Sequence, residues 1–218
     1  EADVSLLDLV NALDCNFAGR EELLRSLTKS PTFGNDDDRA DDIARALFNT
    51  YFDAIDGRPN TNGGSYRINL LPTTVHIYFG KMVGATANGR VAGAPLSDGI
   101  SPSQGADRNG PTAVVRSMGK IDHVRTGGTL LNQKFLPSVL AGDSGINKLA
   151  ALVRTYFRYD GHHIQFNVVG ADTLRDAKLH PEAHRDLIVR VAGYSDYFNN
   201  LEPSLQDEII ARTAHEEL

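Results

Sequence analysis

Residues 187–198 read Leu187-Ile188-Val189-Arg190-Val191-Ala192-Gly193-Tyr194-Ser195-Asp196-Tyr197-Phe198. The apolar run at the start predicts a short strand, and Gly193 predicts a tight turn at its end, because glycine tolerates unusual backbone angles. Aromatic residues follow the turn at Tyr194, Tyr197 and Phe198. Such side chains exclude water and oxygen from a loop tip. The stretch therefore indicates a strand that carries a glycine into an apolar setting.

The segments before and after this stretch alternate between strand and helix patterns. Residues 129–135 and 163–168 have strand patterns, and the amphipathic pattern of 146–157 predicts a helix between them. Asp172 is placed to cap a further helix, and Ser204-Leu205-Gln206-Asp207 resembles a capping box for the last one. Strands that alternate with helices favour an α/β architecture.

Helices are also predicted in the first part of the chain. Residues 6–13 and 21–27 have helical spacing, and Asp36-Asp37-Asp38 leads into a helix that contains Ile43, Leu47, Phe48 and Tyr51. The aspartates suit the positive end of that helix better than a calcium loop, because their spacing is not that of an EF-hand. From 57 to 110 the chain is rich in Gly, Pro, Asn and Ser around one strand-like run, Val75–Phe79. Such a long loop region is expected to form the wall of a pocket.

Charge and hydropathy exclude several classes of protein. The chain has 218 residues and a formal net charge of −6, without a long basic run, so neither nucleic acid nor an anionic membrane is an expected partner. It has no apolar run of roughly 18 residues and no secretion signal at its start, which predicts a cytoplasmic location. Because the chain begins at Glu1 without a methionine, we expect it to be part of a longer protein.

The metal-binding residue types are few. Cys15 is the single cysteine, so the chain has no internal disulfide and no cysteine cluster for zinc or iron-sulfur binding. Cys15 falls in a helical pattern and is interpreted as a small buried packing residue. His76, His162 and His163 alternate with apolar residues, which favours pocket or core roles over metal ligation. No residue is assigned as a metal ligand.

Gly193 has two interpretations at this point. A glycine after a strand is ordinarily a turn residue. A glycine Cα also bears two hydrogens and no side chain, so it can hold an unpaired electron that is delocalised over the neighbouring amide nitrogen and carbonyl.

Several blocks of the sequence are similar to one family. The segment Val189–Phe198 resembles the glycyl radical motif Arg-Val-x-Gly-Tyr, and residues 205–213 resemble the tail of the same family. Four further blocks resemble family segments and follow in the expected order: Thr73–Gly80, Asn88–Arg90, Pro95–Pro102 and Gly161–Asn167. The chain thus resembles the C-terminal part of a glycyl radical enzyme of the pyruvate formate-lyase-like type.

The resemblance implies a fold and a set of partners. It implies the C-terminal portion of a ten-stranded α/β barrel, with residues 1–72 in the barrel domain and 73–218 in the glycine radical domain. It implies no bound cofactor, but a radical on Gly193 that a separate activating enzyme installs with S-adenosylmethionine and an iron-sulfur cluster. Oxygen cleaves such a radical at the backbone, so activity is expected only under anaerobic conditions. A homodimer and a small-molecule substrate are also implied.

The resemblance also implies a cysteine in a Cys-x-Glu motif, which relays the radical to the substrate while the glutamate acts as a general base. Cys15 does not match, because no acid follows two residues later. We therefore expect an N-terminal portion of the same enzyme to supply this cysteine, the base and much of the substrate pocket.

The substrate is predicted less directly. Residues 64–74 are similar to carbon-sulfur lyases that act on hydroxyalkyl sulfonates such as isethionate, and release sulfite and an aldehyde. Arg67 is the candidate anion ligand, because a guanidinium presents forked donors, although a structural ion pair is an equal alternative. A diol dehydratase, a choline trimethylamine-lyase and an arylacetate decarboxylase of the same family also remain open. So do a free-standing spare part that repairs a damaged enzyme and, outside the family, an α/β binding module.

Overall fold

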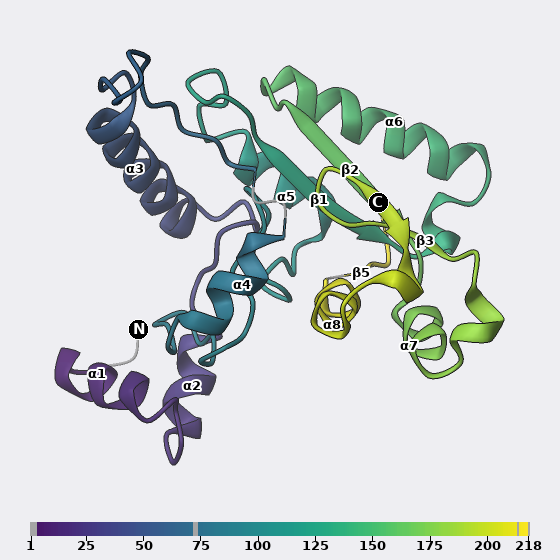
Figure 1. The fold of residues 1–218 in the computed structure, drawn as a ribbon, viewed down its shortest axis with the longest axis horizontal. Helices are drawn as coiled ribbons and strands as arrows, with labels where there is room; N and C mark the ends of the chain where they lie inside the picture. The colour runs from purple at the N-terminus through teal and green to yellow at the C-terminus, as the bar shows by residue number, and fades with distance from the viewer. Residues whose placement is uncertain (1–3, 72–73, 213, 218) are drawn as a thin grey trace.

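The computed structural model describes residues 4–71, 74–212 and 214–217. Its helices and strands are shown in Figure 1. In chain order they are α1 (Leu6–Asp14), α2 (Glu21–Leu27), α3 (Asp38–Ile55), α4 (Val75–Met82), α5 (Gly110–Met118), β1 (Leu130–Phe135), α6 (Gly142–Arg158), β2 (His163–Val168), α7 (Ala171–Leu179), β3 (Ile188–Arg190), β4 (Ser195–Tyr197), α8 (Pro203–Ala211) and β5 (Ala214–His215). Short 3-10 helices lie at Pro137–Leu140, Pro181–His184 and Phe198–Asn200. The expected boundary at residues 72 and 73 falls outside the described part.

A parallel sheet with the strand order β2-β1-β5 forms the centre of the molecule. Strands β1 and β2 pair from Leu130↔His163 to Phe135↔Val168, and α6 connects them along the sheet (Figure 1). Leu131 and Phe135 of β1 pack in one apolar core with side chains of α5 and α6. A parallel pair needs such a crossover helix, so the strand-helix-strand order confirms the predicted α/β class.

The stretch that carries Gly193 forms an antiparallel hairpin. Strands β3 and β4 pair at three positions, which end at Arg190↔Ser195, and Gly193 lies in the connecting loop. Val189 and Val191 are buried in a second core, together with Leu174 of α7 and Ile209 of α8. The predicted strand and turn are therefore confirmed, and α7 and α8 support the hairpin from beneath.

The N-terminal helices carry exposed apolar faces. In Figure 1, α1 and α2 extend away from the sheet. On α3, Phe48 and Phe52 are buried against Ile68 and Ile121, whereas Ile43, Leu47 and Tyr51 are exposed. The sequence predicted one apolar face for this helix, but the structure buries only the phenylalanine stripe. The second stripe is the kind of surface that another part of a protein covers.

The strand predicted at Val75–Phe79 is wrong, because this segment is the helix α4. Its valine, isoleucine and aromatic residues favour a strand locally. Tertiary packing selects the helix: His76, Ile77 and Gly80 are buried on one side. A Cβ on Gly80 would lie 2.5 Å from the Ala94 carbonyl oxygen, so the close approach of two backbone segments requires glycine there.

Three local predictions are also corrected. Cys15 is exposed, because it ends α1 in the extended N-terminal part. Asp172 lies inside α7 and does not cap it, and Ser204 lies inside α8, which begins after Glu202 without a side-chain cap. The predicted aspartate start of α3 is confirmed, since the Asp37 side chain accepts a hydrogen bond from the Arg39 N–H.

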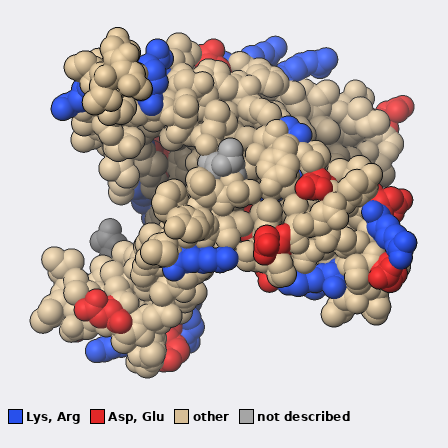
Figure 2. Space-filling model, in the orientation of Figure 1, with Lys and Arg blue, Asp and Glu red and all other residues tan. Residues whose placement is uncertain are grey.

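The surface in Figure 2 is mostly uncharged, and acidic and basic side chains are scattered over this face without a continuous patch of either sign. Within the described ranges, every helix is too short or too polar to span a bilayer.

Two basic side chains are buried where the last strand joins the sheet. The Lys134 ammonium donates to the carbonyls of Ile209 and Ile210 at 3.3 and 2.9 Å, so it caps the end of α8. Burial lowers the pKa of Lys134 to about 8. Burial and then the charge of Lys134 lower the pKa of His215 to about 4. The Asp107 carboxylate lies 3.5 Å from the His215 ring, but its attraction does not offset the burial, so the ring is neutral at neutral pH.

We predict that His215 makes the stability depend on pH between 6.5 and 4. The unfolded chain takes up a proton at this ring near pH 6.5, whereas the folded chain does so only near pH 4. Stability is therefore fully present above pH 6.5 and falls by up to about 3 kcal/mol as the pH drops to 4. Urea unfolding at several pH values measures this, and His215→Gln should flatten the dependence. The exposed His180→Gln is the control. An unchanged profile for His215→Gln would contradict the assignment.

Candidate functional site

The tip of the β3–β4 hairpin is a four-residue loop from Val191 to Tyr194. The Val191 N–H donates to the Tyr194 carbonyl at 2.9 Å, which closes the loop. Gly193 has a φ of +82°, an angle that L side chains rarely adopt. A Cβ placed on it would meet no atom of the described residues outside its chain neighbours within 4 Å. The Gly193 Cα is therefore open to an approaching group on the side where other residues carry a side chain.

Gln165 of β2 binds the loop through its side-chain amide. Its Oε1 accepts hydrogen bonds from the Gly193 N–H at 3.1 Å and from the Arg190 Nε at 2.9 Å. Its Nε2 donates to the Val191 carbonyl at 3.2 Å and to the Asn132 Oδ1. The side chain is 4% exposed, and all its hydrogen-bonding groups have partners. The glycine is thus attached directly to the central sheet.

Asn167 binds the hairpin at Arg190, the last residue of β3 before the loop. It lies two residues after Gln165 on the same face of β2, and its side chain exchanges two hydrogen bonds of 2.7 Å with the backbone N–H and carbonyl of Arg190. This exchange copies the pairing of a neighbouring strand. The sequence predicted a half-buried strand here, and the residues of β2 that the structure buries are Gln165 and Asn167.

Arg212, after the end of α8, holds the other side of the loop. Its guanidinium donates to the carbonyls of Val191 at 3.0 Å and Arg190 at 3.4 Å. It also makes a two-pronged ion pair with Glu208, at 3.0 and 2.9 Å, and lies 3.5 Å from the Asp98 carboxylate. Asp98 in turn accepts a hydrogen bond from Asn132, the residue that contacts Gln165. Gln165 and Arg212, the two side chains that hold the loop, are therefore linked to each other through Asn132 and Asp98.

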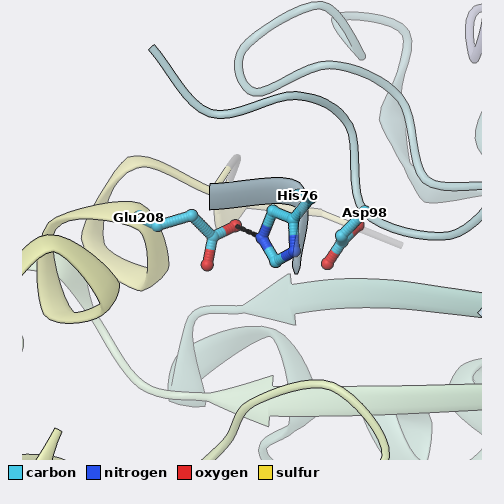
Figure 3. Close-up of side chains that lie close together, drawn as sticks. All are labelled: His76, Asp98 and Glu208. Carbon is cyan, nitrogen blue, oxygen red and sulfur yellow. Dashed lines mark ion pairs between the residues drawn. The ribbon is translucent and has the colours of Figure 1, made fainter. Parts of the chain in front are cut away.

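Figure 3 shows the buried acids beside this anchor, with the His76 ring between the carboxylates of Asp98 and Glu208. The His76 Nε2 lies 3.6 Å from the Glu208 carboxylate, too far for a hydrogen bond. Burial raises the pKa of Glu208, but His76 and Arg212 outweigh it and lower the pKa to about 2. Glu208 is consequently ionised at any physiological pH.

His76, Asp98 and Glu208 offer ligand atoms within 4.8 Å of one another, a spacing that a metal ion could bridge. Arg212 already lies against both carboxylates and supplies the positive charge that balances them. A metal ion would have to displace this guanidinium and release the two loop carbonyls. We therefore assign the cluster to support of the loop.

The two residues predicted as site residues lie in different parts of the molecule. Gly193 lies at the hairpin tip beside β2. Arg67 follows α3, and its Nε lies 3.1 Å from the Asp56 carboxylate. In Figure 1, α3 and β3 are on opposite sides of the view. Sequence reasoning missed the residues that hold the tip: Asp98, Asn132, Gln165, Asn167, Glu208 and Arg212. Gln165 and Asn167 fell within a recognised block, and their alternation with apolar residues indicated a shared face of the strand but not their partners.

The loop region between 57 and 110 does form a cavity wall, as predicted. A groove of about 840 Å³ runs between residues 88–108 and the side of α8, and Glu208 reaches its edge. Gln104 of this wall donates to Glu208 at 3.2 Å. The groove therefore adjoins the buried acids behind the loop.

Comparison with known proteins gives consistent matches. Residues 96–199 match the family model described as Glycine radical, and residues 1–80 match the model described as Pyruvate formate lyase-like. A trans-4-hydroxy-L-proline dehydratase of Clostridioides difficile is 56% identical over 206 residues, which are 94% of this chain and 26% of that protein. An isethionate sulfite-lyase of Bilophila wadsworthia is 44% identical over 213 residues, which are 96% of this chain and 26% of that protein.

A solved structure agrees with the sequence matches. The crystal structure of hydroxyproline dehydratase from Clostridioides difficile with trans-4-hydroxy-L-proline bound matches with a TM-score of 0.94 and 54% identity, over 98% of this chain and 27% of that chain. The chain spans about a quarter of the length of these relatives.

We predict that Arg212→Met costs about 3 to 5 kcal/mol of unfolding free energy, because it leaves Glu208 and Asp98 buried without their cation. Urea unfolding measures the loss. Arg185→Met is the matched control, since Arg185 pairs with Glu182 in an exposed position where an ion pair contributes little. Equal, small effects of the two substitutions would show that Arg212 does not anchor the loop.

Proposed function

Since the chain belongs to the glycyl radical enzymes, we propose that Gly193 is the residue that stores the radical and that this chain is the radical-bearing part of a lyase. The observation that carries the proposal is the loop tip: a glycine in the motif Arg-Val-x-Gly-Tyr, with an open Cα and its N–H fixed to the sheet. We likewise propose residues 1–72 as barrel domain and 73–218 as glycine radical domain.

Activation would be a hydrogen-atom transfer. One C–H bond of Gly193 breaks homolytically, the hydrogen atom passes to the abstracting radical of a separate activating enzyme, and the unpaired electron stays on Cα. Within this chain no described residue covers that side of Gly193, which is compatible with this step, because the abstracting group needs direct access to the C–H bond. The residues around the tip then hold the backbone in place without taking part in the bond changes.

The relay cysteine would come from a part of the protein outside this chain. Cys15 ends α1, and in Figure 1 that helix lies far from the hairpin. It is also not followed by an acid two positions later. The match of residues 1–80 to the lyase-like model supports a part of a full enzyme over a free-standing repair protein, which needs only the glycine-bearing domain. A homodimer remains a prediction.

We propose a dehydratase, acting on a small hydroxylated substrate of the hydroxyproline type, as the first candidate. The support is the identity of 56% to trans-4-hydroxy-L-proline dehydratase, against 44% to isethionate sulfite-lyase. In such a reaction a hydrogen atom is removed from the carbon next to the one that bears the hydroxyl group, the hydroxyl group leaves with a proton as water, and the hydrogen atom is returned to the product radical.

Carbon-sulfur cleavage of a sulfonate such as isethionate is the second candidate. Its support is the block at residues 64–74 and the guanidinium of Arg67. The pairing of Arg67 with Asp56 weakens it, because the partner carboxylate already balances the charge that a sulfonate would need.

We predict that Gly193→Ala abolishes the radical. The enzyme that carries this chain, activated without oxygen, should give an electron paramagnetic resonance doublet that the variant lacks, since alanine holds a planar radical less well. Gly142→Ala is the matched control: Gly142 also has a positive φ, +69°, and open space around it, but lies at the start of α6. Loss of the signal in both variants would indicate general damage. No doublet in the wild type, when a known enzyme is activated in parallel, would refute the radical assignment.

We also predict the order of substrates. The activated enzyme should release water from trans-4-hydroxy-L-proline at least tenfold faster than it releases sulfite from isethionate. Arg67→Gln should leave either rate within about twofold, because Arg67 is tied to Asp56. Faster sulfite release, lost in Arg67→Gln, would instead favour the second candidate.

A further inference from the structure

We propose that Gln165 is a positioning residue for the glycyl radical: its side-chain carbonyl fixes the Gly193 N–H and so sets the orientation and the electron supply of the radical centre. The inference rests on the proposed function of Gly193. Among the described residues, Gln165 is the side chain that binds the Gly193 backbone: its Oε1 accepts a hydrogen bond from the Gly193 N–H at 3.1 Å.

The orientation of the Gln165 amide follows from its partners alone. The Gly193 N–H and the Arg190 Nε are donors only, so both must face the amide oxygen. The Val191 carbonyl is an acceptor only, so it must face the amide nitrogen. A flipped amide would lose these bonds. Its nitrogen would face the two donors, and its oxygen would face the Val191 carbonyl. Gln165 therefore presents a carbonyl to the glycine, and the loop itself enforces this choice.

A second set of residues keeps the amide in place. The Gln165 nitrogen donates to the Asn132 Oδ1, the Asn132 nitrogen donates to Asp98, and Asp98 lies 3.5 Å from Arg212. Arg212 returns to the loop at the Val191 carbonyl. Gln165, Asp98 and Arg212 are buried, Asn132 is half-buried, and the four come from distant parts of the sequence. Because the circuit closes, rotation of Gln165 would break contacts on both sides of it.

The bond to the N–H bears on the radical directly. An unpaired electron on a glycine Cα draws electron density from the adjacent nitrogen. An acceptor on the N–H strengthens that donation, because it polarises the N–H bond toward nitrogen. The same bond fixes the plane of the peptide before Gly193 and with it the direction in which the open C–H bond points. Loss of the acceptor should therefore change both the yield and the spectrum of the radical.

Asn167 provides a matched comparison within the same strand. It is as buried as Gln165, lies on the same face of β2 and makes two bonds to the hairpin, but both end at Arg190. If both residues served hairpin stability alone, substitution of either would change the radical in the same way. A role in positioning the radical singles out Gln165.

The experiment compares four forms of the enzyme that carries this chain: wild type, Gln165→Met, Gln165→Glu and Asn167→Leu. Each is labelled with ¹⁵N-glycine and activated without oxygen. Spin counting gives the radical yield, and electron-nuclear double resonance gives the couplings of the Gly193 nitrogen and amide proton. Protein folding is checked by urea unfolding.

Gln165→Met should reduce the spins per chain about tenfold, the equivalent of about 1.4 kcal/mol for the lost hydrogen bond to the Gly193 N–H, and shift the nitrogen and amide-proton couplings of the residual signal. Gln165→Glu keeps an acceptor for the Gly193 N–H but loses the two hydrogen bonds that the Gln165 nitrogen donates, so its couplings should lie closer to those of the wild type than the couplings of Gln165→Met do. Asn167→Leu should give the couplings of the wild type, whatever its effect on stability.

Two other outcomes overturn the inference. If the wild type gives a doublet and Gln165→Met keeps its yield and couplings, the role of Gln165 is refuted and Gly193 remains the radical site. The same conclusion follows if Asn167→Leu changes the yield and couplings as much as Gln165→Met does. Absence of a doublet in the wild type would refute the proposed function, and the role of Gln165 would fall with it.

Discussion

The hairpin that carries Gly193 pairs at three positions, and a ribbon of that length does not hold its own tip in place. The carbonyls of Arg190 and Val191 therefore receive hydrogen bonds from side chains on other elements, Gln165 and Asn167 from the sheet and Arg212 from beyond α8. Buried polar groups of this kind are costly unless all of them are paired. Much of the polar interior can be understood as the completion of these bonds.

The buried charged residues near the loop are explained by the same need to pair the loop carbonyls. Arg212 reaches the loop only if its guanidinium is balanced in a buried site, which explains Glu208 and Asp98 beside it. Lys134 performs a related task at the end of α8, where it binds carbonyls that the helix leaves open. The parallel sheet, the last helix and the loop are thus connected through a few ionic side chains.

The sequence predicted the larger elements and the position of the glycine well. The α/β class is confirmed, as is its assignment to part of the α/β barrel of the glycyl radical enzymes. The helix at Val75–Met82 was missed because its β-branched and aromatic residues favour a strand, whereas contacts with residues 94 and 95 decide the outcome. Gln165 and Asn167 were missed as anchors because burial of polar residues depends on partners distant in sequence, which periodicity does not reveal.

The attachment of α8 has a consequence for damage at the loop. If Gly193 stores the radical as proposed, oxygen would cut the backbone there and separate the segment that contains β4, α8 and β5 from the rest of the chain. Phe198, Leu205 and Ile209 would remain in the core with α7, and Arg212 would still hold the Val191 carbonyl. The severed piece would stay docked as a non-covalent complement. An inactivated molecule would accordingly keep its native shape and surface, and a cell would have to recognise the lesion by chemistry instead of by unfolding.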